Sequence, residues 1–222
     1  MNIRSLVLLS LACVGCTDDG LNVRNNEPVA TVVYPSAGAE LVEGYVTTLL
    51  GSVTDTNDHS EDLVATWLLG DEVLCEEAPI GADGSTVCEA TFEPGEIEVT
   101  LTTLDPDDAT GAATTPLTVS PNQAPVVQVF TPDGTGPYHT DAYIVFEAIV
   151  SDVEVDPSAL AVAWLDASGA MLDIDDVVDT DGFLSGAIQL AAGTHVISLT
   201  ATDGPGLTGS ASVTLEVTDP VE

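Results

Sequence analysis

The sequence contains no lysine, and its only two arginines are Arg4 and Arg24 among 222 residues. Against them stand 37 aspartates and glutamates, which give a formal net charge of −35 at pH 7. Proteins that bind nucleic acid use clustered Lys and Arg to neutralise phosphates, and proteins that dock on anionic lipid need the same charges. The composition therefore argues against a nucleic-acid partner and against electrostatic attachment to a membrane.

Catalytic signatures are also scarce. The three histidines, His59, His139 and His195, lie far apart in the sequence, and no GxSxG, HExxH, P-loop or GxGxxG motif occurs. With so many acidic residues, some pair of carboxylates will always have the spacing of a glycosidase site, so such a pair is uninformative. We therefore expect a protein that is not an enzyme and requires no cofactor.

No apolar run reaches the roughly 20 residues that a membrane-spanning helix needs. Instead, Arg4 precedes a shorter apolar run over residues 5–14, followed by small residues, which is the pattern of a secretory signal. The segment Val14-Gly15-Cys16 resembles the lipobox of bacterial lipoproteins, although Cys13 stands where that family usually has Leu. The resemblance implies a signal peptide over 1–15 and a lipidated N-terminal Cys16, with Cys13 as the alternative.

Counting cysteines favours Cys16 over Cys13. Lipidation of Cys16 removes Cys13 with the signal and leaves Cys75 and Cys88 as an even pair, whereas cleavage before Cys13 leaves an odd thiol in an oxidising compartment. We expect Cys75 and Cys88 to form a structural disulfide. We also expect several acyl chains to hold the protein at the cell envelope, in the outer membrane with a periplasmic or surface-exposed face.

A repeat of 97 to 98 residues organises the rest of the chain. Residues 25–29 (NNEPV) return as residues 122–126 (NQAPV), and the two tryptophans, Trp67 and Trp164, keep the same spacing. Further matched pairs are Pro35 and Pro132, Asp55 and Asp152, Leu63 and Leu160, Asp83-Gly84 and Asp181-Gly182, Gly95 and Gly193, and Asp105 and Asp203. A register held over some ninety residues indicates a tandem duplication.

Each copy is composed of short segments in which apolar and polar residues alternate, as in strands with one buried face. Leu63, Ala65 and Trp67 share one face of such a segment. Besides this segment and the last two of each copy, we expect strands near 29–34, 46–53, 72–75 and 86–92, with counterparts near 126–131, 143–150, 170–173 and 183–190. No window predicts an amphipathic helix.

Seven strands with a tryptophan on the third are typical of a Greek-key β-sandwich. The pattern resembles the tandem immunoglobulin-like (Ig-like) and PKD-type modules of bacterial surface proteins, although the WDFGDG-like signature of PKD modules is missing. The predicted fold is all-β, with two tandem Ig-like sandwiches. The predicted parts are a tether over 16–27, a first domain over 28–120, a linker over 121–125 and a second domain over 126–219.

Acidic residues are concentrated in loops that this topology brings to one end of each sandwich. Converging carboxylates repel each other unless a cation lies between them, and their hard oxygen ligands suit Ca²⁺. The candidate ligands are Asp152, Glu154, Asp156, Asp203, Asp55 and Asp105. The alternative is a solvated acidic rim, because aspartate is also a common turn residue.

These observations favour a non-catalytic structural, adhesive or spacer module that is attached to the membrane through its lipid. Two alternatives remain. A carbohydrate-binding module would use exposed aromatics, for which Tyr138, Tyr143 and Phe183 are the candidates. An accessory subunit of an envelope assembly would be recognised through its edge strands. The expected ligand is accordingly a protein or a glycan at the cell surface.

Overall fold

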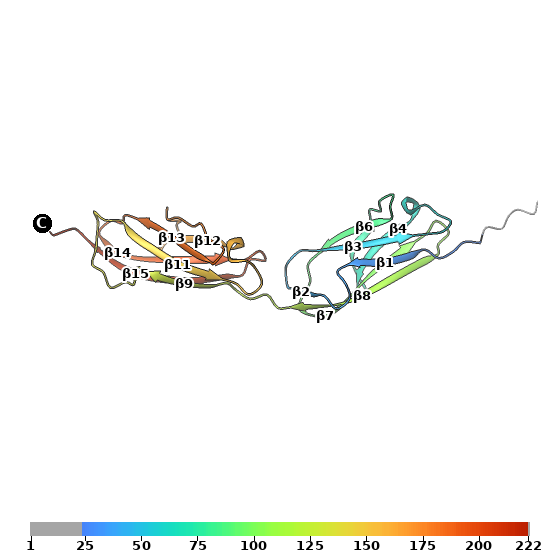
Figure 1. The fold of residues 1–222 in the computed structure, drawn as a ribbon, viewed down its shortest axis with the longest axis horizontal. Coiled ribbons are helices and arrows are strands. Elements are labelled where there is room, and N and C mark those ends of the chain that lie inside the picture. The colour runs from blue at the N-terminus through green and yellow to red at the C-terminus, as the bar shows by residue number, and fades with distance from the viewer. Residues whose placement is uncertain (1–23, 222) are drawn as a thin grey trace, which may run out of the picture.

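Two β-sandwiches stand end to end in the computed structural model, which describes residues 24–221 (Figure 1). The predicted signal peptide, Cys13, Cys16 and most of the predicted tether lie outside the described residues. Within the described range the only helical elements are two 3₁₀ turns, η1 (Ser60–Asp62) and η2 (Pro157–Ala159). The predicted all-β fold of two tandem sandwiches is confirmed.

The first sandwich contains a sheet of three strands and a sheet of five strands. The smaller sheet has the order β1 (Val29–Tyr34), β3 (Thr47–Thr54), β6 (Ser85–Ala90). The larger has the order β2 (Glu40–Val42), β8 (Thr110–Ser120), β7 (Gly95–Leu104), β4 (Val64–Leu69), β5 (Glu72–Ala78). All pairs are antiparallel except β2 with β8, which is parallel. The chain therefore crosses from one sheet to the other between β1 and β2.

The second sandwich repeats this arrangement with one strand fewer. Its smaller sheet has the order β13 (Phe183–Ile188), β11 (Ile144–Ser151), β9 (Val126–Thr131). Its larger sheet has the order β10 (Tyr138–His139), β15 (Thr208–Thr218), β14 (Gly193–Thr202), β12 (Ala161–Leu165). The parallel pair recurs as β10 with β15.

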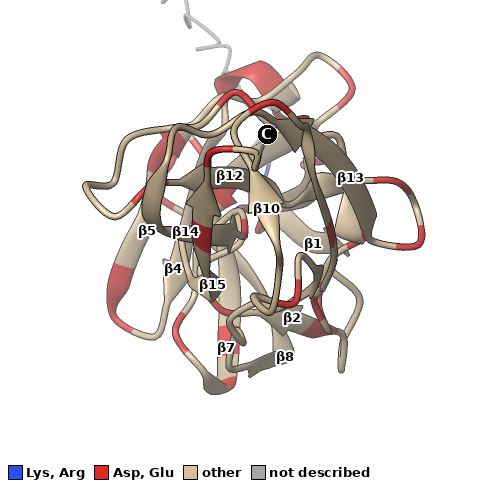
Figure 2. Ribbon diagram, turned by 90° about the vertical axis from the view of Figure 1, so that its left-hand side faces the viewer, with Lys and Arg blue, Asp and Glu red and all other residues tan. Residues whose placement is uncertain are grey.

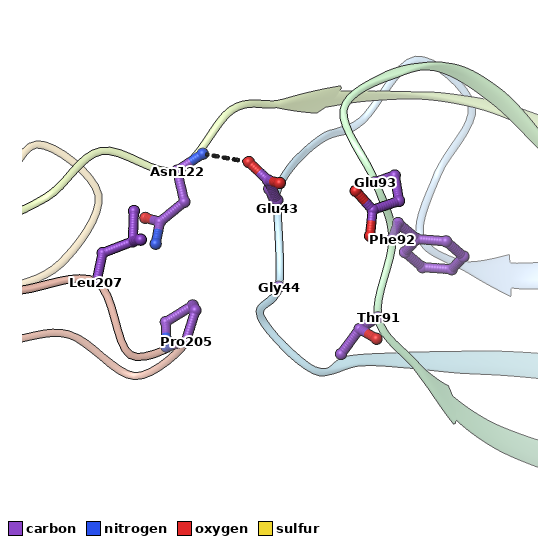
Figure 3. A pocket seen from close by; sticks show the side chains of 8 residues that line it. All are labelled: Glu43, Gly44, Thr91, Phe92, Glu93, Asn122, Pro205 and Leu207. Carbon is purple, nitrogen blue, oxygen red and sulfur yellow. Dashed lines mark hydrogen bonds between the residues drawn. The ribbon is translucent and has the colours of Figure 1, made fainter.

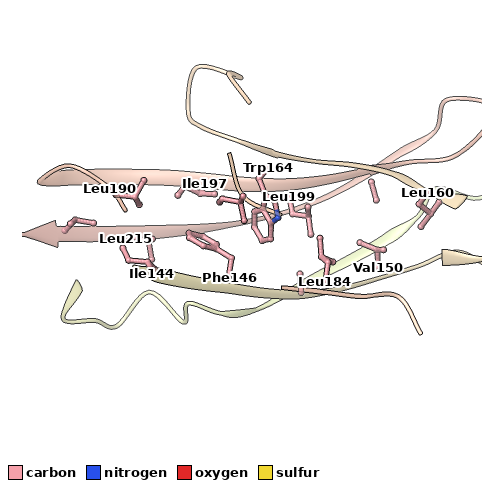
Figure 4. Packing of buried hydrophobic residues seen from close by; sticks show 14 residues of the cluster. Ile144, Phe146, Val150, Leu160, Trp164, Leu184, Leu190, Ile197, Leu199 and Leu215 are labelled. Carbon is pink, nitrogen blue, oxygen red and sulfur yellow. The ribbon is translucent and has the colours of Figure 1, made fainter. Parts of the chain in front are cut away.

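A buried tryptophan lies at the centre of each core, where the alternating apolar residues of the two sheets meet. In the second domain Trp164 packs edge-to-face on Phe146, with ring centroids 5.1 Å apart (Figure 4). Leu49 takes the place of Phe146 in the first domain, and Trp67 instead lies close to Gly51, where a β-carbon would be 2.8 Å from its ring. The two cores thus use different partners around the same aromatic residue.

The two domains also close one flank of the sandwich differently. The strand predicted near 170–173 does not form; Met171 makes only an isolated bridge with Leu165, because this Asp- and Gly-rich segment favours turns over a continuous strand. The loop instead buries Ile174 against Gly186.

The first domain has Cys88 at the position of Gly186. The predicted disulfide between Cys75 and Cys88 is present, with a Cα–Cα distance of 6.0 Å. It joins β5 of one sheet to β6 of the other. A covalent bond therefore connects the sheets where the second domain uses the side chain of Ile174.

Replacing Cys75 and Cys88 together by alanine is expected to destabilise the first domain by about 3 kcal/mol, because the unfolded chain regains the freedom that the closed loop removes. Differential scanning calorimetry of the double variant measures this change. The transition of the second domain is the internal control and stays in place. An unchanged first transition would contradict a stabilising role for the disulfide.

Candidate metal centre

The acidic loops of each domain lie at the end that is closer to the N-terminus. In the first domain these are the β3–β4 loop, which contains η1, and the β7–β8 loop; in the second they are the β11–β12 loop, which contains η2, and the β14–β15 loop. Figure 1 shows η1 at the outer end of the first domain and η2 beside the joint between the domains. One acidic end is thus open, and the other faces the preceding domain.

Three carboxylates converge at the open end of the first domain. Asp55, Asp58 and Asp105 each contribute one oxygen, and these oxygens all lie within 4.8 Å of one another. Desolvation raises the pKa of Asp58, and the neighbouring charges of Asp55 and Asp105 raise it further. This cluster, which we call the open acidic site, therefore contains strong like-charge repulsion.

Backbone amides hold the carboxylates of the open acidic site in position. Oδ1 of Asp55 accepts hydrogen bonds from the N–H groups of Asn57 and Asp58 at 2.7 and 3.1 Å. Its other oxygen, Oδ2, is buried and has no hydrogen-bond partner among the described residues. One oxygen of Asp55 thus builds the loop, and the other remains available for a ligand.

Asp105 is anchored in the same way and is only 3 % exposed. Its Oδ1 accepts the N–H groups of Asp107 and Ala109 at 2.9 and 2.8 Å, and its Oδ2 accepts the side-chain amide of Asn25 at 2.7 Å. Burial opposes ionisation, but the hydrogen bonds from Asn25 and the two amides outweigh it and hold the pKa of Asp105 below its usual value. This carboxylate is therefore charged at neutral pH.

The hydrogen bonds that fix the carboxylates recur at the joint, among residues Asn122, Asp152, Glu154 and Asp203, which we call the joint acidic site. Oδ1 of Asp152 accepts the N–H groups of Glu154 and Val155 at 2.8 and 3.2 Å. Oδ2 of Asp203 accepts the side-chain amide of Asn122 at 2.6 Å, as Asp105 does from Asn25 in the first domain. The match is incomplete, because Val155 stands at the position of Asp58 and Glu154 at that of Asn57. Among the described residues, three carboxylate oxygens within 4.8 Å of one another occur at the open acidic site alone.

Several buried oxygens of the joint acidic site lack a partner among the described residues. They are Oδ2 of Asp152, Oε2 of Glu154, Oδ1 of Asn122 and the hydroxyl of Tyr45. A buried polar atom without a hydrogen bond costs about 1–3 kcal/mol, so four of them at one end of a domain require an explanation. Oxygen ligands of this kind suit a hard cation such as Ca²⁺.

Tyr45 reaches this site from the other domain. Its ring lies against Gly204, where a β-carbon would be 3.2 Å from Cε1. Burial raises the pKa of the Tyr45 hydroxyl, and the neighbouring charges of Asp203 and Asp152 raise it further. The first domain therefore places a neutral hydroxyl beside carboxylates of the second.

Other residues complete the contact between the domains. The backbone N–H of Asn122 donates to the Glu43 carboxylate at 3.2 Å (Figure 3). Gly44 packs on Pro205, where a β-carbon would lie only 3.0 Å from the proline ring. A hollow of about 250 Å³ remains between them and is lined on the first-domain side by Phe92. The joint is thus a small, partly polar interface.

Sequence reasoning found part of this arrangement. Of the candidate ligands, Asp55 and Asp105 lie together in the open acidic site, and Asp152, Glu154 and Asp203 lie in the loops of the joint acidic site. Asp156 has another role, because its carboxylate accepts from Ser158 and caps η2.

The candidate ligands did not include Asp58, although the sequence places it among the acids of the same loop as Asp55. Asn25, Asn122 and Tyr45 were not considered as part of a site. The two asparagines carried a signal, since they are matched in the repeat. No sequence signal pointed to Tyr45, because its position beside the carboxylates of the second domain depends on the contact between the domains.

No family model and no curated protein matches the chain. Among solved structures, fibronectin(III)-like modules of CbhA from Clostridium thermocellum match with 18% identity and a TM-score of 0.42, covering 86% of this chain and 95% of that one. A chimeric titin Z1Z2 matches with 15% identity and a TM-score of 0.41, covering 88% and 100%. A 1.5-MDa bacterial ice-binding adhesin matches with 11% identity and a TM-score of 0.45, covering 90% and 68%. These similarities concern the fold alone.

Aspartate and glutamate residues occur on loops and strands around the molecule, as the end-on view shows (Figure 2). Within residues 24–221, no helix is long and apolar enough to cross a membrane.

Asp58 is expected to titrate at a higher pH than Asp83 of the same domain, whose pKa is lowered by hydrogen bonds from Ser85. The folded state holds the Asp58 proton to a higher pH than the unfolded chain, so this group's favourable contribution to stability is lost as pH rises through its folded pKa. Carbon-detected NMR of the carboxyl groups measures both titrations. Millimolar Ca²⁺ should lower the Asp58 midpoint and leave Asp83 unchanged; an equal effect on both would indicate screening alone.

Proposed function

We propose that this protein is a lipid-anchored, non-catalytic rod of the bacterial cell envelope. In this proposal its two Ig-like domains hold the far end of the second domain away from the membrane, as a spacer or adhesive module. Calcium binds at the open and joint acidic sites and stiffens the rod. The observation that carries the proposal is the joint acidic site, where one domain closes on the carboxylates of the other.

The support for a cation is electrostatic. Like charges that are fixed within a few ångströms by backbone amides cannot move apart, so their repulsion persists until a counter-ion enters. Among the described residues, Asp55 and Asp152 each keep one buried oxygen without a partner, while their other oxygen accepts loop amides at both sites. The formation of a turn explains why Oδ1 of each aspartate accepts backbone N–H groups. It does not explain why Oδ2 of each is buried without a hydrogen-bond partner among the described residues.

The support for a stiff rod comes from the short connection between the domains. β8 ends at Ser120 and β9 begins at Val126, and this segment contains Pro121 and Pro125. Tyr45 and Glu43 contact the second domain directly. A cation bound at the joint acidic site would add to these contacts and reduce bending between the domains.

The anchor is tested by replacing Cys16 with serine. This variant is expected to lose lipid, because serine provides no thiol for acylation, and to appear in the soluble envelope fraction. Metabolic labelling with a fatty acid and mass spectrometry of the mature N-terminus measure the outcome. The matched control is Cys13→Ser, which should keep the lipid on Cys16; labelling that follows Cys13 instead would contradict the assignment.

Calcium binding is tested by thermal melts at constant ionic strength, because any salt screens so acidic a protein. A tenfold excess of Ca²⁺ over its dissociation constant should stabilise by about 1.4 kcal/mol, or several degrees. Asp152→Asn should reduce this gain in the second domain, because the amide oxygen can still accept the loop N–H groups but carries no charge.

The control variant is Asp141→Asn, an exposed acid outside both sites, which should keep the full response. Small-angle X-ray scattering of the same samples measures whether Ca²⁺ narrows the distribution of shapes. If Ca²⁺ changes neither the melting temperature nor the scattering profile of the wild type, calcium binding is contradicted. The lipid anchor is tested separately by Cys16→Ser.

A further inference from the structure

Three aromatic side chains line one hollow at the end of the second domain that lies away from the joint. Phe130 near the end of β9, Tyr138 in β10 and Tyr143 just before β11 surround a volume of about 350 Å³. Figure 2 looks onto this end of the molecule, with β10 in front. Phe183, the other aromatic considered from the sequence, lies elsewhere, since it pairs with Ile149 at the opposite end of β11.

Two of these three aromatics lie largely outside the core. Tyr143 is 70% exposed and Phe130 is 47% exposed, and only Tyr138 packs partly against the core. The first domain has the same fold with Val33, Leu41 and Val46 at the matched positions. The aromatic hollow is therefore a property of the second domain alone, at a surface where large exposed apolar side chains mark interaction sites.

A carboxylate is fixed at the wall of the hollow. Oδ1 of Asp133 accepts the N–H and hydroxyl of Thr135 at 3.0 and 2.8 Å and the Tyr138 hydroxyl at 3.4 Å. Among the described residues, no hydrogen bond reaches its Oδ2. A second acid is close, because Glu147 accepts from Thr131, which also lines the hollow, at 3.3 Å. The site thus combines aromatic faces with fixed negative charge.

Charge complementarity decides which ligand suits this combination. The faces of aromatic rings attract cations, and a carboxylate beside them adds a direct ionic partner. The chain carries a net charge of −35. Among the described residues the one Lys or Arg is Arg24, and its neighbour Asn25 binds Asp105 in the first domain, not in the second. The negative potential of the protein repels phosphates and acidic glycans, and it adds nothing to the affinity for a neutral sugar.

We propose that the hollow formed by Phe130, Tyr138, Tyr143 and Asp133 binds a Lys or Arg side chain presented by a basic segment of a partner protein. The aliphatic part of that side chain contacts Val145 and Pro132, which also line the hollow, and its cationic group faces the rings and the carboxylate. The hollow is near the lower end of the usual range for ligand sites, about 300–1,000 Å³, which suits one side chain rather than a large ligand.

The test uses NMR on the full chain at constant ionic strength, with N-acetyl-lysine amide, N-acetyl-arginine amide and a pentalysine peptide as probes. The expected result is a set of shift changes confined to the hollow. Tyr143→Ala and Asp133→Asn should each weaken binding roughly two- to five-fold, and Tyr143→Phe should retain it. The control Tyr34→Ala, which removes an exposed aromatic of the first domain, should change nothing.

Several outcomes would overturn the proposal. Shift changes spread evenly over the acidic surface, and unaltered by Tyr143→Ala, would mean general charge attraction. Full binding by Tyr143→Leu would exclude a role for the ring. Maltose or phosphatidylcholine vesicles that perturb the hollow where the basic probes do not would assign it to a sugar or a lipid head group. None of these results bears on the anchor or on calcium.

Discussion

The packing of one indole ring between two sheets is the contact on which each half of this molecule depends. Trp67 and Trp164 lie on the strands that face the smaller sheets, and apolar residues at every second position surround them. Burying such a ring removes a large apolar area from water, at about 25 cal/mol for each Å². Because face-packed sheets lie about 10 Å apart, this core also sets the distance between the loops at either end. The distance between the loops that carry the acidic residues therefore depends on this core.

Around that shared core the two copies have diverged at their edges. The first joins its sheets with the Cys75–Cys88 disulfide, while the second buries Ile174 against Gly186 at the corresponding flank. The first leaves its acidic loops open, while the second receives Tyr45 and Glu43 from its neighbour. Only the second carries the aromatic hollow. The two copies therefore share one framework, and their differences lie at the flank of the sandwich, at the joint and on the surface.

The alternation of apolar residues was sufficient to predict the strands and the pairing of the two copies, because a half-buried strand requires that pattern. The prediction was wrong near 170–173. There the expected strand assumed that the second copy follows the first, yet Asp166, Gly169 and Asp173 favour turns, and Asp166 closes one by accepting the N–H groups of Ser168 and Ala170. The short strands β2 and β10 were also missed, since two or three residues carry too little pattern to distinguish them from a loop.

The sequence by itself determined the all-β fold, the tandem duplication, the acidity and the disulfide, because each is carried by periodicity, spacing or composition along the chain. It also indicated which loops carry the acids, since Asp55 and Asp152 are matched in the repeat. Only the tertiary structure decided that one oxygen of each binds backbone amides while the other stays buried without a partner. It alone brought Tyr45 to Gly204 and gathered Phe130, Tyr138 and Tyr143 around one hollow. Such contacts join residues that share no periodic pattern, and they exist only after the sheets have packed and the domains have met.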